Sequence, residues 1–277
     1  MAMAKRDRVR LAAGALLSVS AVCTVLLTLC AGGNAVQTFA AHSAAVQEAA
    51  SPAPQGPLYG LVIAVDAGHG GYDGGAVGRV SGVPEKGLNL DVARRLDGLL
   101  TGLGAQVVMT RTDDYALCDE DPPIRKKLQD MQRRARLIMD CGADVVLSIH
   151  MNEYAGRAQS GPQVFYREDC PAGRLLAGAV QESMNEALAP RKDRTALPGD
   201  YYILTLGVPS VLVECGFLSN REEESLLLTA DYRQKVAAAV AQGVLTWQAL
   251  GDVRPEPLPA VDPVSYTHLT LPTKVKV

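Results

Sequence analysis

The segment Val62–Gly75, with the sequence VIAVDAGHGGYDGG, constrains the fold of this chain more than any other segment. Its short apolar run contains β-branched residues and passes directly into a glycine-rich loop, a pattern typical of a buried strand that ends in a turn. His69 lies in that loop, and ligands of open α/β sheets bind outside the carboxyl ends of strands. Glycines on both sides of His69 allow positive φ and keep bulky neighbours away from its imidazole. The segment therefore predicts that His69 belongs to a functional site.

Strand-like and helix-like segments alternate along the chain after Gly60. Apolar runs predict strands over residues 61–65, 106–110, 144–149, 163–166, 201–204 and 210–213. Apolar residues at helical spacing predict helices over residues 88–103, 125–141, 171–188 and 232–250. This alternation indicates an α/β fold, in which a mostly parallel twisted sheet carries helices on both faces.

The two ends of the chain differ in composition from the part between them. Basic residues followed by the uncharged apolar run Leu11–Ala31 predict a signal peptide or membrane anchor over residues 1–34. No basic cluster follows that run, so the main domain is expected outside the cytoplasm, tied to a membrane if the segment is uncleaved. Residues 35–59 predict a flexible linker, and residues 60–251 the catalytic domain. Residues 252–277 predict a disordered tail whose last part, Ser265–Val277, is interpreted as an artefact of assembly or read-through.

The overall composition excludes one broad class of function. The chain has 277 residues, of which 48% are hydrophobic, enough for a sizeable core, and its formal net charge is −3. A nucleic-acid-binding domain is expected to carry a clustered basic excess, and single-strand binders use aromatic platforms, whereas only 5% of these residues are aromatic. We therefore expect no nucleic-acid partner, and we expect the chain to act as a monomer.

Six cysteines are present, and none of them forms a C-x-x-C pair. A cysteine-based zinc site is therefore disfavoured. Cys118 and Cys170 both lie in loop-like sequence and could pair in an exported protein, while Cys141 and Cys215 are expected to behave as small buried apolar residues.

The histidines are few, and their positions are informative. Of the four, two lie in the terminal segments, which leaves His69 and His150 in the folded part, each after a predicted strand. The carboxyl ends of parallel strands face one crevice, so these two side chains are expected to lie close together. A zinc site with an open position needs three protein ligands, usually histidines with one carboxylate. No H-E-x-x-H motif occurs, so the third ligand must be an acid from a loop.

Three glutamates could supply that carboxylate. Glu85 follows Pro84 at the start of a predicted helix, where an acid is also favoured simply by the helix macrodipole. Glu153 has H-x-x-E spacing from His150, although it could equally be a solvated loop acid. Glu214 follows three apolar residues, so burial is expected to raise its pKa toward the range of a general base. The residues alone leave these alternatives open.

Several segments carry a specific resemblance to a known family. They are VDAGHGG at 65–71, DGGA at 73–76, EK at 85–86, NL at 89–90, VVMTRT at 107–112, SIHMN at 148–152 and VECGFLSN at 213–220. In these segments the chain resembles the zinc-dependent N-acetylmuramoyl-L-alanine amidases of the amidase-3 type, which are peptidoglycan hydrolases. The resemblance covers about Leu61 to Leu250 in the family's order. A single domain behind an N-terminal apolar segment is similar to the spore-cortex amidase branch of endospore formers.

The resemblance implies a metal site and a catalytic acid. It implies that His69, Glu85 and His150 bind one Zn2+ per chain and that Glu214 is the catalytic carboxylate. The reaction it implies is hydrolysis of the amide bond between the lactyl group of N-acetylmuramic acid and L-alanine of the stem peptide. Zinc would polarise the carbonyl and lower the pKa of water, and Glu214 would move the proton to the leaving nitrogen.

The resemblance also bears on substrate and partners. Asn152 matches a family position near the substrate and Arg111 matches a family arginine, and both are predicted to bind substrate. Glu153 is not part of the family's pattern. Peptidoglycan is the expected substrate, an activator protein is a further expected partner, and the expected location is extracytoplasmic.

Two other functions compete with the amidase. A nucleotide-binding enzyme would need G-x-G-x-x-G after the first strand, but Asp73 stands where the third glycine is required. A non-catalytic peptidoglycan-binding module of the same fold would not need the four proposed metal and acid residues, all of which are present. The basic helix over residues 125–136 could follow anionic wall polymer, although a solvated helix face is the simpler interpretation.

Overall fold

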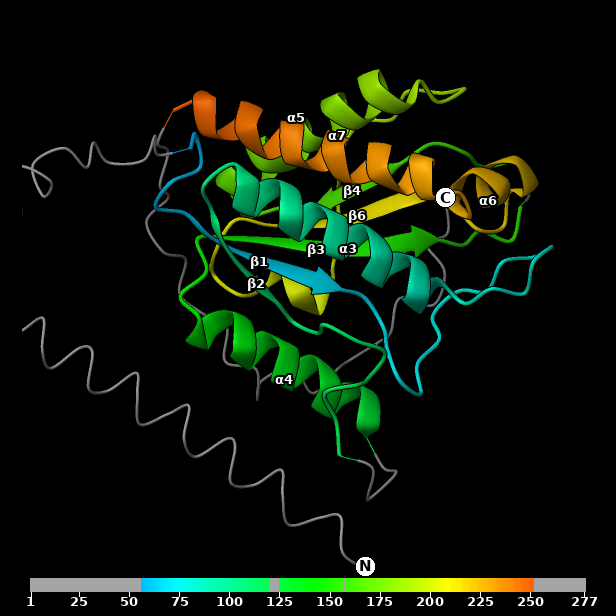
Figure 1. The fold of residues 1–277 in the computed structure, drawn as a ribbon, viewed down its shortest axis with the longest axis horizontal. Helices are drawn as coiled ribbons and strands as arrows, with labels where there is room; N and C mark the ends of the chain where they lie inside the picture. Colours follow the sequence, from blue (N-terminus) through cyan, green and yellow to red (C-terminus); the bar gives the residue numbers. More distant parts are fainter. Residues whose placement is uncertain (1–55, 120–124, 157, 252–277) are drawn as a thin grey trace, which may run out of the picture. The chain divides into compact units, whose positions relative to one another are not determined.

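Six strands form one sheet in the order β2-β1-β3-β6-β4-β5 in this computed structural model, which describes residues 56–119, 125–156 and 158–251 (Figure 1). The strands are β1 (Val62–Ala67), β2 (Gln106–Met109), β3 (Val145–Asn152), β4 (Gln163–Tyr166), β5 (Leu197–Pro198) and β6 (Ser210–Phe217). The pairs β1–β2, β1–β3, β3–β6 and β4–β5 are parallel, and only the β4–β6 pair is antiparallel. This arrangement confirms the mostly parallel α/β sheet predicted from the alternation of elements.

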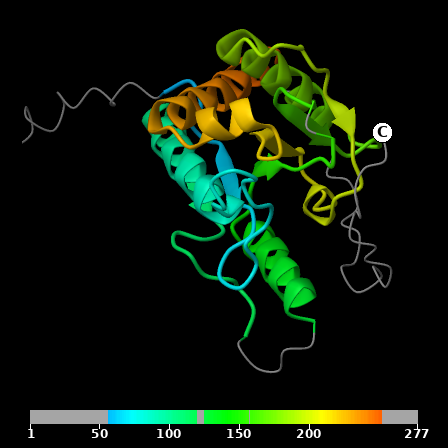
Figure 2. The same ribbon diagram turned by 90° about the vertical axis from the view of Figure 1, so that its right-hand side faces the viewer.

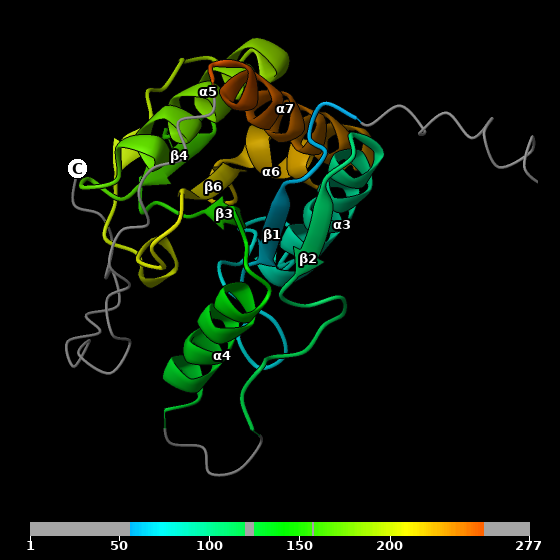
Figure 3. The same ribbon diagram turned by 90° about the vertical axis from the view of Figure 1, so that its left-hand side faces the viewer.

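Helices cover both faces of the sheet, as predicted. One face carries α3 (Glu85–Gly102), α5 (Pro171–Leu188) and α7 (Ala230–Ala249), and α7 packs against the other two. The other face carries α4 (Lys126–Asp140) (Figures 1 and 3). The short helix α6 (Arg221–Leu227) follows β6 and was not predicted. The glycine-rich loop after β1 lies at the end of the sheet that faces the viewer in Figure 2.

The core is divided by the sheet into a large and a small cluster. Alternate residues of the central strands, such as Val65 and Leu147, are fully buried in the large cluster with side chains of α3, α5 and α7. Their neighbours Ala64 and Val146 belong to the small cluster, which includes Ile138 of α4. Both faces of the sheet are therefore buried, which explains the nearly continuous apolar runs in the sequence.

The prediction of a strand over Tyr201–Leu204 is wrong. This segment contains the 3-10 helix η2 (Tyr202–Leu204), whose side chains Ile203 and Leu204 are buried in the small core cluster. A short apolar run is compatible with either element, and here burial under the sheet, not pairing with it, satisfies the apolar side chains.

The folded part begins earlier than expected. Leu58, which falls within the predicted linker, is fully buried, and its N–H donates to the carbonyl of Leu103 at 3.0 Å. The predicted signal or anchor, the rest of the linker and the tail lie outside the described residues. Across 56–119, 125–156 and 158–251, no helix is both long and apolar enough to span a membrane.

Four cysteines lie in the described residues, and all four are free thiols. The predicted pairing of Cys118 with Cys170 is therefore not formed. Cys170 instead caps the N-terminus of α5, where its Sγ accepts a hydrogen bond from the N–H of Gly173 at 3.3 Å. Cys215 is buried, as expected, whereas Cys141 is only half-buried.

Both edges of the sheet are short. The edge strand β2 has four residues, and β5 at the opposite edge has two, Leu197 and Pro198. Beyond β6 the antiparallel strand β4 separates the parallel core from this edge.

Candidate metal centre and active site

The loop after β1 holds His69 in an unusual backbone conformation. His69 has φ 61°, a left-handed conformation that residues with a Cβ rarely adopt and that concentrates at functional sites. Gly70 and Asp73 exchange backbone hydrogen bonds of 2.9 and 3.1 Å, which closes a tight turn just beyond it. The glycines around His69 permit this turn, as the sequence pattern predicted.

His150 and Glu214 face each other across neighbouring strands. They are direct partners in the register of β3 and β6, and a register shift follows this pair at once. The predicted ends of the two strands, just before His150 and at Glu214, are wrong, because β3 continues to Asn152 and β6 to Phe217. Strand pairing continues past them, and the bulge in β6 marks the place where the two strands change course.

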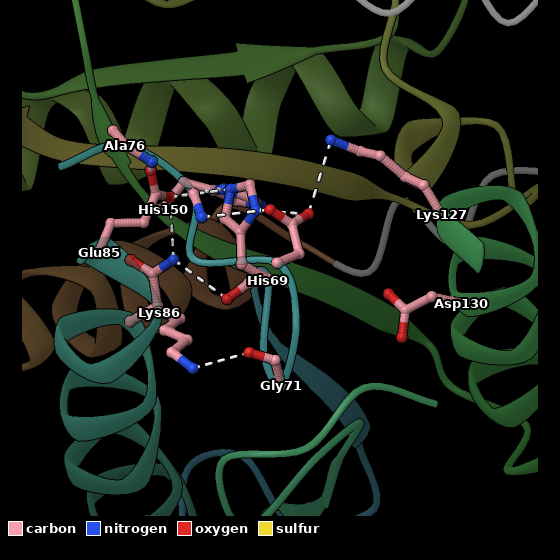
Figure 4. A network of polar contacts seen from close by, with 12 residues as sticks. His69, Gly71, Ala76, Glu85, Lys86, Lys127, Asp130 and His150 are labelled. Carbon is pink, nitrogen blue, oxygen red and sulfur yellow. Dashed lines mark hydrogen bonds and ion pairs between the residues drawn. The ribbon is translucent and has the colours of Figure 1, made fainter. Parts of the chain in front are cut away.

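Glu85 brings the two histidines together. It is the first residue of α3 and is almost completely buried, and its Oε1 lies 3.1 Å from Nε2 of His69 and 3.2 Å from Nδ1 of His150 (Figure 4). The other oxygen, Oε2, accepts a hydrogen bond from the N–H of Ala76 at 2.6 Å, and Asn89 donates its Nδ2 to Oε1 at 3.0 Å. Of the three glutamates considered from the sequence, only Glu85 lies between both imidazoles.

The geometry of this cluster fits a metal ion. One ligand atom from each of His69, Glu85 and His150 lies within 4.8 Å of the others, and the described residues contain no other such group. Ligand atoms about 2 Å from a tetrahedral zinc ion lie about 3.3 Å apart, close to the two distances at Glu85. A Cβ at Gly68 would overlap the His150 ring, and one at Gly75 would overlap Glu85 and His69. The surrounding glycines therefore give the three ligands the space they occupy.

The electrostatics of the cluster favour positive charge. Burial alone would lower the pKa of His69, but the carboxylates of Asp73 and Glu85 outweigh it and raise that pKa to about 9. Asp73 Oδ2 lies 2.9 Å from Nδ1 of His69. Burial opposes ionisation of Glu85, yet the neighbouring histidines hold its pKa well below the usual range. Two ionised carboxylates beside the imidazoles provide an environment that suits a cation.

Glu214 is desolvated, as the apolar residues before it indicated. Burial first, and then the negative charge of Glu85, raise its pKa to about 8. Its Oε2 is buried and has no hydrogen-bond partner among the described residues. Buried polar atoms are nearly always paired, so this unpaired oxygen indicates a group that is kept free for a reaction.

Asn152 and Glu153 lie near the end of β3 and differ in their surroundings. Asn152 is half-buried, and its backbone carbonyl accepts from the N–H of Leu218 at 2.8 Å. Glu153 is exposed and lies outside the cluster of metal-ligating side chains. The structure therefore gives no support to Glu153 as the third ligand.

The prediction that Arg111 binds substrate needs correction. Its side chain is fully buried, and its guanidinium donates to the backbone carbonyls of Ala67, Gly68, Lys86 and Asp113 at 2.7–3.1 Å. These bonds join the loop of His69 to the start of α3. Arg111 thus organises the backbone that carries two of the cluster residues, and no part of it is exposed to a substrate.

Sequence reasoning did not single out Asp73 or Asn89 as supports of the cluster. Both could have been found from their spacing, because Asn89 follows Glu85 by one helical turn and Asp73 follows His69 within the same glycine-rich turn. Side chains that orient metal ligands commonly contact them in this way.

A group of metal-ligating side chains with an unpaired base beside it is the arrangement that metal-dependent hydrolases require. The open end of a mostly parallel sheet is also where α/β enzymes bind their ligands.

The chain belongs to the amidase-3 family, because the family model described as N-acetylmuramoyl-L-alanine amidase matches residues 63–246. This confirms the resemblance noted in the sequence and the predicted class of enzyme. The chain is 36% identical over 195 residues to the germination-specific N-acetylmuramoyl-L-alanine amidase of Bacillus subtilis, covering 69% of this chain and 81% of that protein. It is 29% identical to the amidase AmiA of Escherichia coli, covering 67% and 75% respectively.

Solved structures agree with this assignment. The CwlD amidase of Clostridioides difficile, in complex with the GerS lipoprotein, superposes with a TM-score of 0.67 at 32% identity. The match covers 69% of this chain and all of that one. The catalytic domain of the amidase CwlV from Bacillus (Paenibacillus) polymyxa matches with a TM-score of 0.60 at 29% identity, covering 69% of this chain and 99% of that domain.

Proposed function

We propose that this amidase uses one Zn2+ per chain to hydrolyse the bond between the lactyl group of N-acetylmuramic acid and L-alanine of the peptidoglycan stem peptide. One observation carries the proposal. His69, Glu85 and His150 converge within 4.8 Å, beside Glu214, whose Oε2 is buried and unpaired. The ligand types and their spacing suit zinc, and the fourth position of such a site stays open for water or substrate.

In the proposed mechanism, His69, Glu85 and His150 would hold the zinc ion. Bound zinc supplies Lewis acidity, which polarises the scissile carbonyl and lowers the pKa of water. Glu214 accepts the proton of the attacking water at its free carboxylate oxygen and returns it to the leaving nitrogen of L-alanine. Its raised pKa suits a group that must both take and give a proton.

A non-catalytic wall-binding module of the same fold explains the site less well. The left-handed backbone of His69 and the unpaired buried oxygen of Glu214 both cost free energy. A module that only binds peptidoglycan has no use for either feature.

We further propose that the enzyme acts outside the cytoplasm on the cell wall. Residues 1–34 would serve as signal peptide or anchor and most of residues 35–59 as linker, and the catalytic domain would act as a monomer. A role in the spore cortex is supported by the similarity to a germination-specific amidase. An activator protein is supported by the CwlD neighbour, which was solved in complex with a lipoprotein. Asn152, near the cluster, is proposed to contact substrate.

Metal analysis and product analysis together test this function. Purified protein is expected to contain about one zinc per chain and to release free stem peptides from sacculi, as identified by mass spectrometry. Chelation should abolish release, and added zinc should restore it. A Glu153→Gln variant serves as the control and should keep both its zinc and its release of stem peptides, because this exposed acid is close in sequence to His150 but lies outside the cluster. Binding to sacculi without release of stem peptides would favour the wall-binding module.

A further inference from the structure

Three consecutive carbonyls at the end of β1 accept hydrogen bonds from two buried arginines. Arg111 donates to the carbonyls of Ala67 and Gly68 at 2.8 and 2.9 Å. Arg134 donates to Ala67 at 2.8 Å and to the carbonyl of His69 at 2.6 Å. Of these two arginines, only Arg134 therefore bonds to the backbone carbonyl of His69 itself, which is a proposed metal ligand.

Arg134 lies on α4, and its own position is fixed by two carboxylates. Its Nε donates to Asp130 and its Nη1 to Asp66, both at 2.8 Å, and the guanidinium is almost completely buried. Asp66 also accepts hydrogen bonds from Thr110 and Ser148 at 2.7 and 2.6 Å. Four of the five N–H groups of this guanidinium point at fixed acceptors, so the side chain has little freedom to move.

We propose that Arg134 is a positioning residue that holds His69 in the conformation in which its imidazole faces Glu85 and His150. A residue with a Cβ keeps a φ of 61° only where its surroundings enforce it. The charged hydrogen bond to the carbonyl of His69 supplies that constraint. Helix α4 thereby forms part of the metal centre, although it provides no ligand. The inference depends on the proposed function only in that the cluster binds zinc.

Lysine cannot replace arginine in this role. A guanidinium reaches two acidic side chains and two backbone carbonyls at once, whereas an ammonium is a compact point charge. Arg134→Lys keeps the positive charge between Asp66 and Asp130, so the buried ion pairs remain, but the bond to the His69 carbonyl is lost. This variant separates the positioning of His69 from the stability of the fold.

The test compares zinc binding in the full chain for the wild type, Arg134→Lys, Arg134→Met and Arg133→Met. Arg133 is the matched control, because it is the neighbouring arginine of α4 and pairs with exposed Asp119. Zinc affinity is measured by competition with a chromophoric chelator, below the melting temperature of every variant. Affinity should fall roughly 10- to 100-fold in Arg134→Lys, as for other supports of metal ligands, and stay unchanged in Arg133→Met. Arg134→Met leaves two buried carboxylates without their cationic partner and should lose thermal stability as well.

Cobalt substitution supplies a readout that a purely structural role would not change. The visible absorption of bound Co2+ reports ligand geometry, so Arg134→Lys should alter this spectrum while Arg133→Met keeps that of the wild type. Wild-type affinity and spectrum in a folded Arg134→Lys variant would overturn the proposal. A wild type that binds zinc but releases no stem peptides would refute the proposed function, and the comparison of affinities would still decide the role of Arg134.

Discussion

The two faces of the central sheet are made by the same strands but differ in the side chains that they bury near the carboxyl ends of those strands. Val65 and Val213 are fully buried in the apolar core beneath α3, α5 and α7. The residues that directly follow them, Asp66 and Glu214, point to the other face, where Asp66 joins a buried ion-pair network and Glu214 borders the candidate site. Both faces bury apolar surface, but the second face also buries charge and keeps one carboxylate oxygen unpaired.

This contrast shows how a strand can serve stability and chemistry together. Because side chains alternate between faces, substitutions one residue apart should affect different properties. Changes on the apolar face should lower stability and leave the turnover of folded molecules intact. Changes to the polar residues of the other face should alter activity or the pH dependence of stability.

The largest effect is expected from Glu214→Gln. Loss of the proton-transferring group should lower kcat by about 1,000-fold, or about 4 kcal/mol. Stability should not fall, because the variant replaces an acid that has a buried, unpaired oxygen. Release of stem peptides and thermal melting measure the two effects, and zinc content should equal that of the wild type. Substantial residual hydrolysis in the variant would assign the proton transfer to another group.

On the apolar face, Leu147→Ala should have the next largest effect. Leu147 is fully buried in the large core cluster, so the cavity left behind should lower the free energy of unfolding by about 3 kcal/mol. Urea denaturation measures this loss, and kcat per folded molecule should stay near that of the wild type. A large fall in kcat with little loss of stability would contradict the idea that changes on the apolar face affect stability and leave turnover intact.

Asp66 should make stability depend on pH. Burial would raise its pKa, but Arg134 and the hydroxyls of Ser148 and Thr110 outweigh it and lower the pKa from 3.8 to about 2. The pKa of Asp66 is lower in the folded state than in the unfolded state. Its contribution to the free energy of unfolding is therefore complete above about pH 5 and is lost as the pH falls toward 2. The shift corresponds to about 2 kcal/mol. Denaturation measured between pH 5 and pH 2 should show this loss of stability in the wild type, and the Asp66→Asn variant should lack it.

Cys118→Ser should have the smallest effect, because Cys118 belongs to neither face and is a free thiol. The free energy of unfolding should change by less than about 0.5 kcal/mol, in the presence or absence of reductant. A large loss of stability that appears only without reductant would show that Cys118 does form a disulfide.

The sequence was sufficient to predict the sheet, most of its helices and the convergence of His69 with His150. Strand ends in a parallel sheet gather at one place, so two histidines near such ends could be paired without knowing any contact. Without the family resemblance, the sequence could not decide which of Glu85, Glu153 and Glu214 is the third metal ligand. A carboxylate can serve as a ligand whether it lies at the start of a helix, in a loop or in a strand. Only the folded chain places Glu85 between the two imidazoles.

Arg111 and Arg134 show the limit of such reasoning most clearly. Arg111 was expected to contact substrate, and the basic residues of α4 were expected on a solvated face, yet both arginines are buried. A buried arginine is stable only with a complete set of acceptors, and here half of the bonds go to backbone carbonyls at the end of β1 and in the loop after it. Hydrophobic periodicity carries no information about such partners.

The short edges of the sheet bear on how the enzyme behaves in solution. An exposed edge strand offers unpaired backbone groups to which a strand of another molecule can add, a common route to aggregation. Here β5 offers only Leu197 and Pro198, and proline has no N–H to donate. The opposite edge, β2, is only four residues long. Within the described residues, the sheet therefore presents little backbone for intermolecular strand addition, which disfavours edge-to-edge aggregation of this domain.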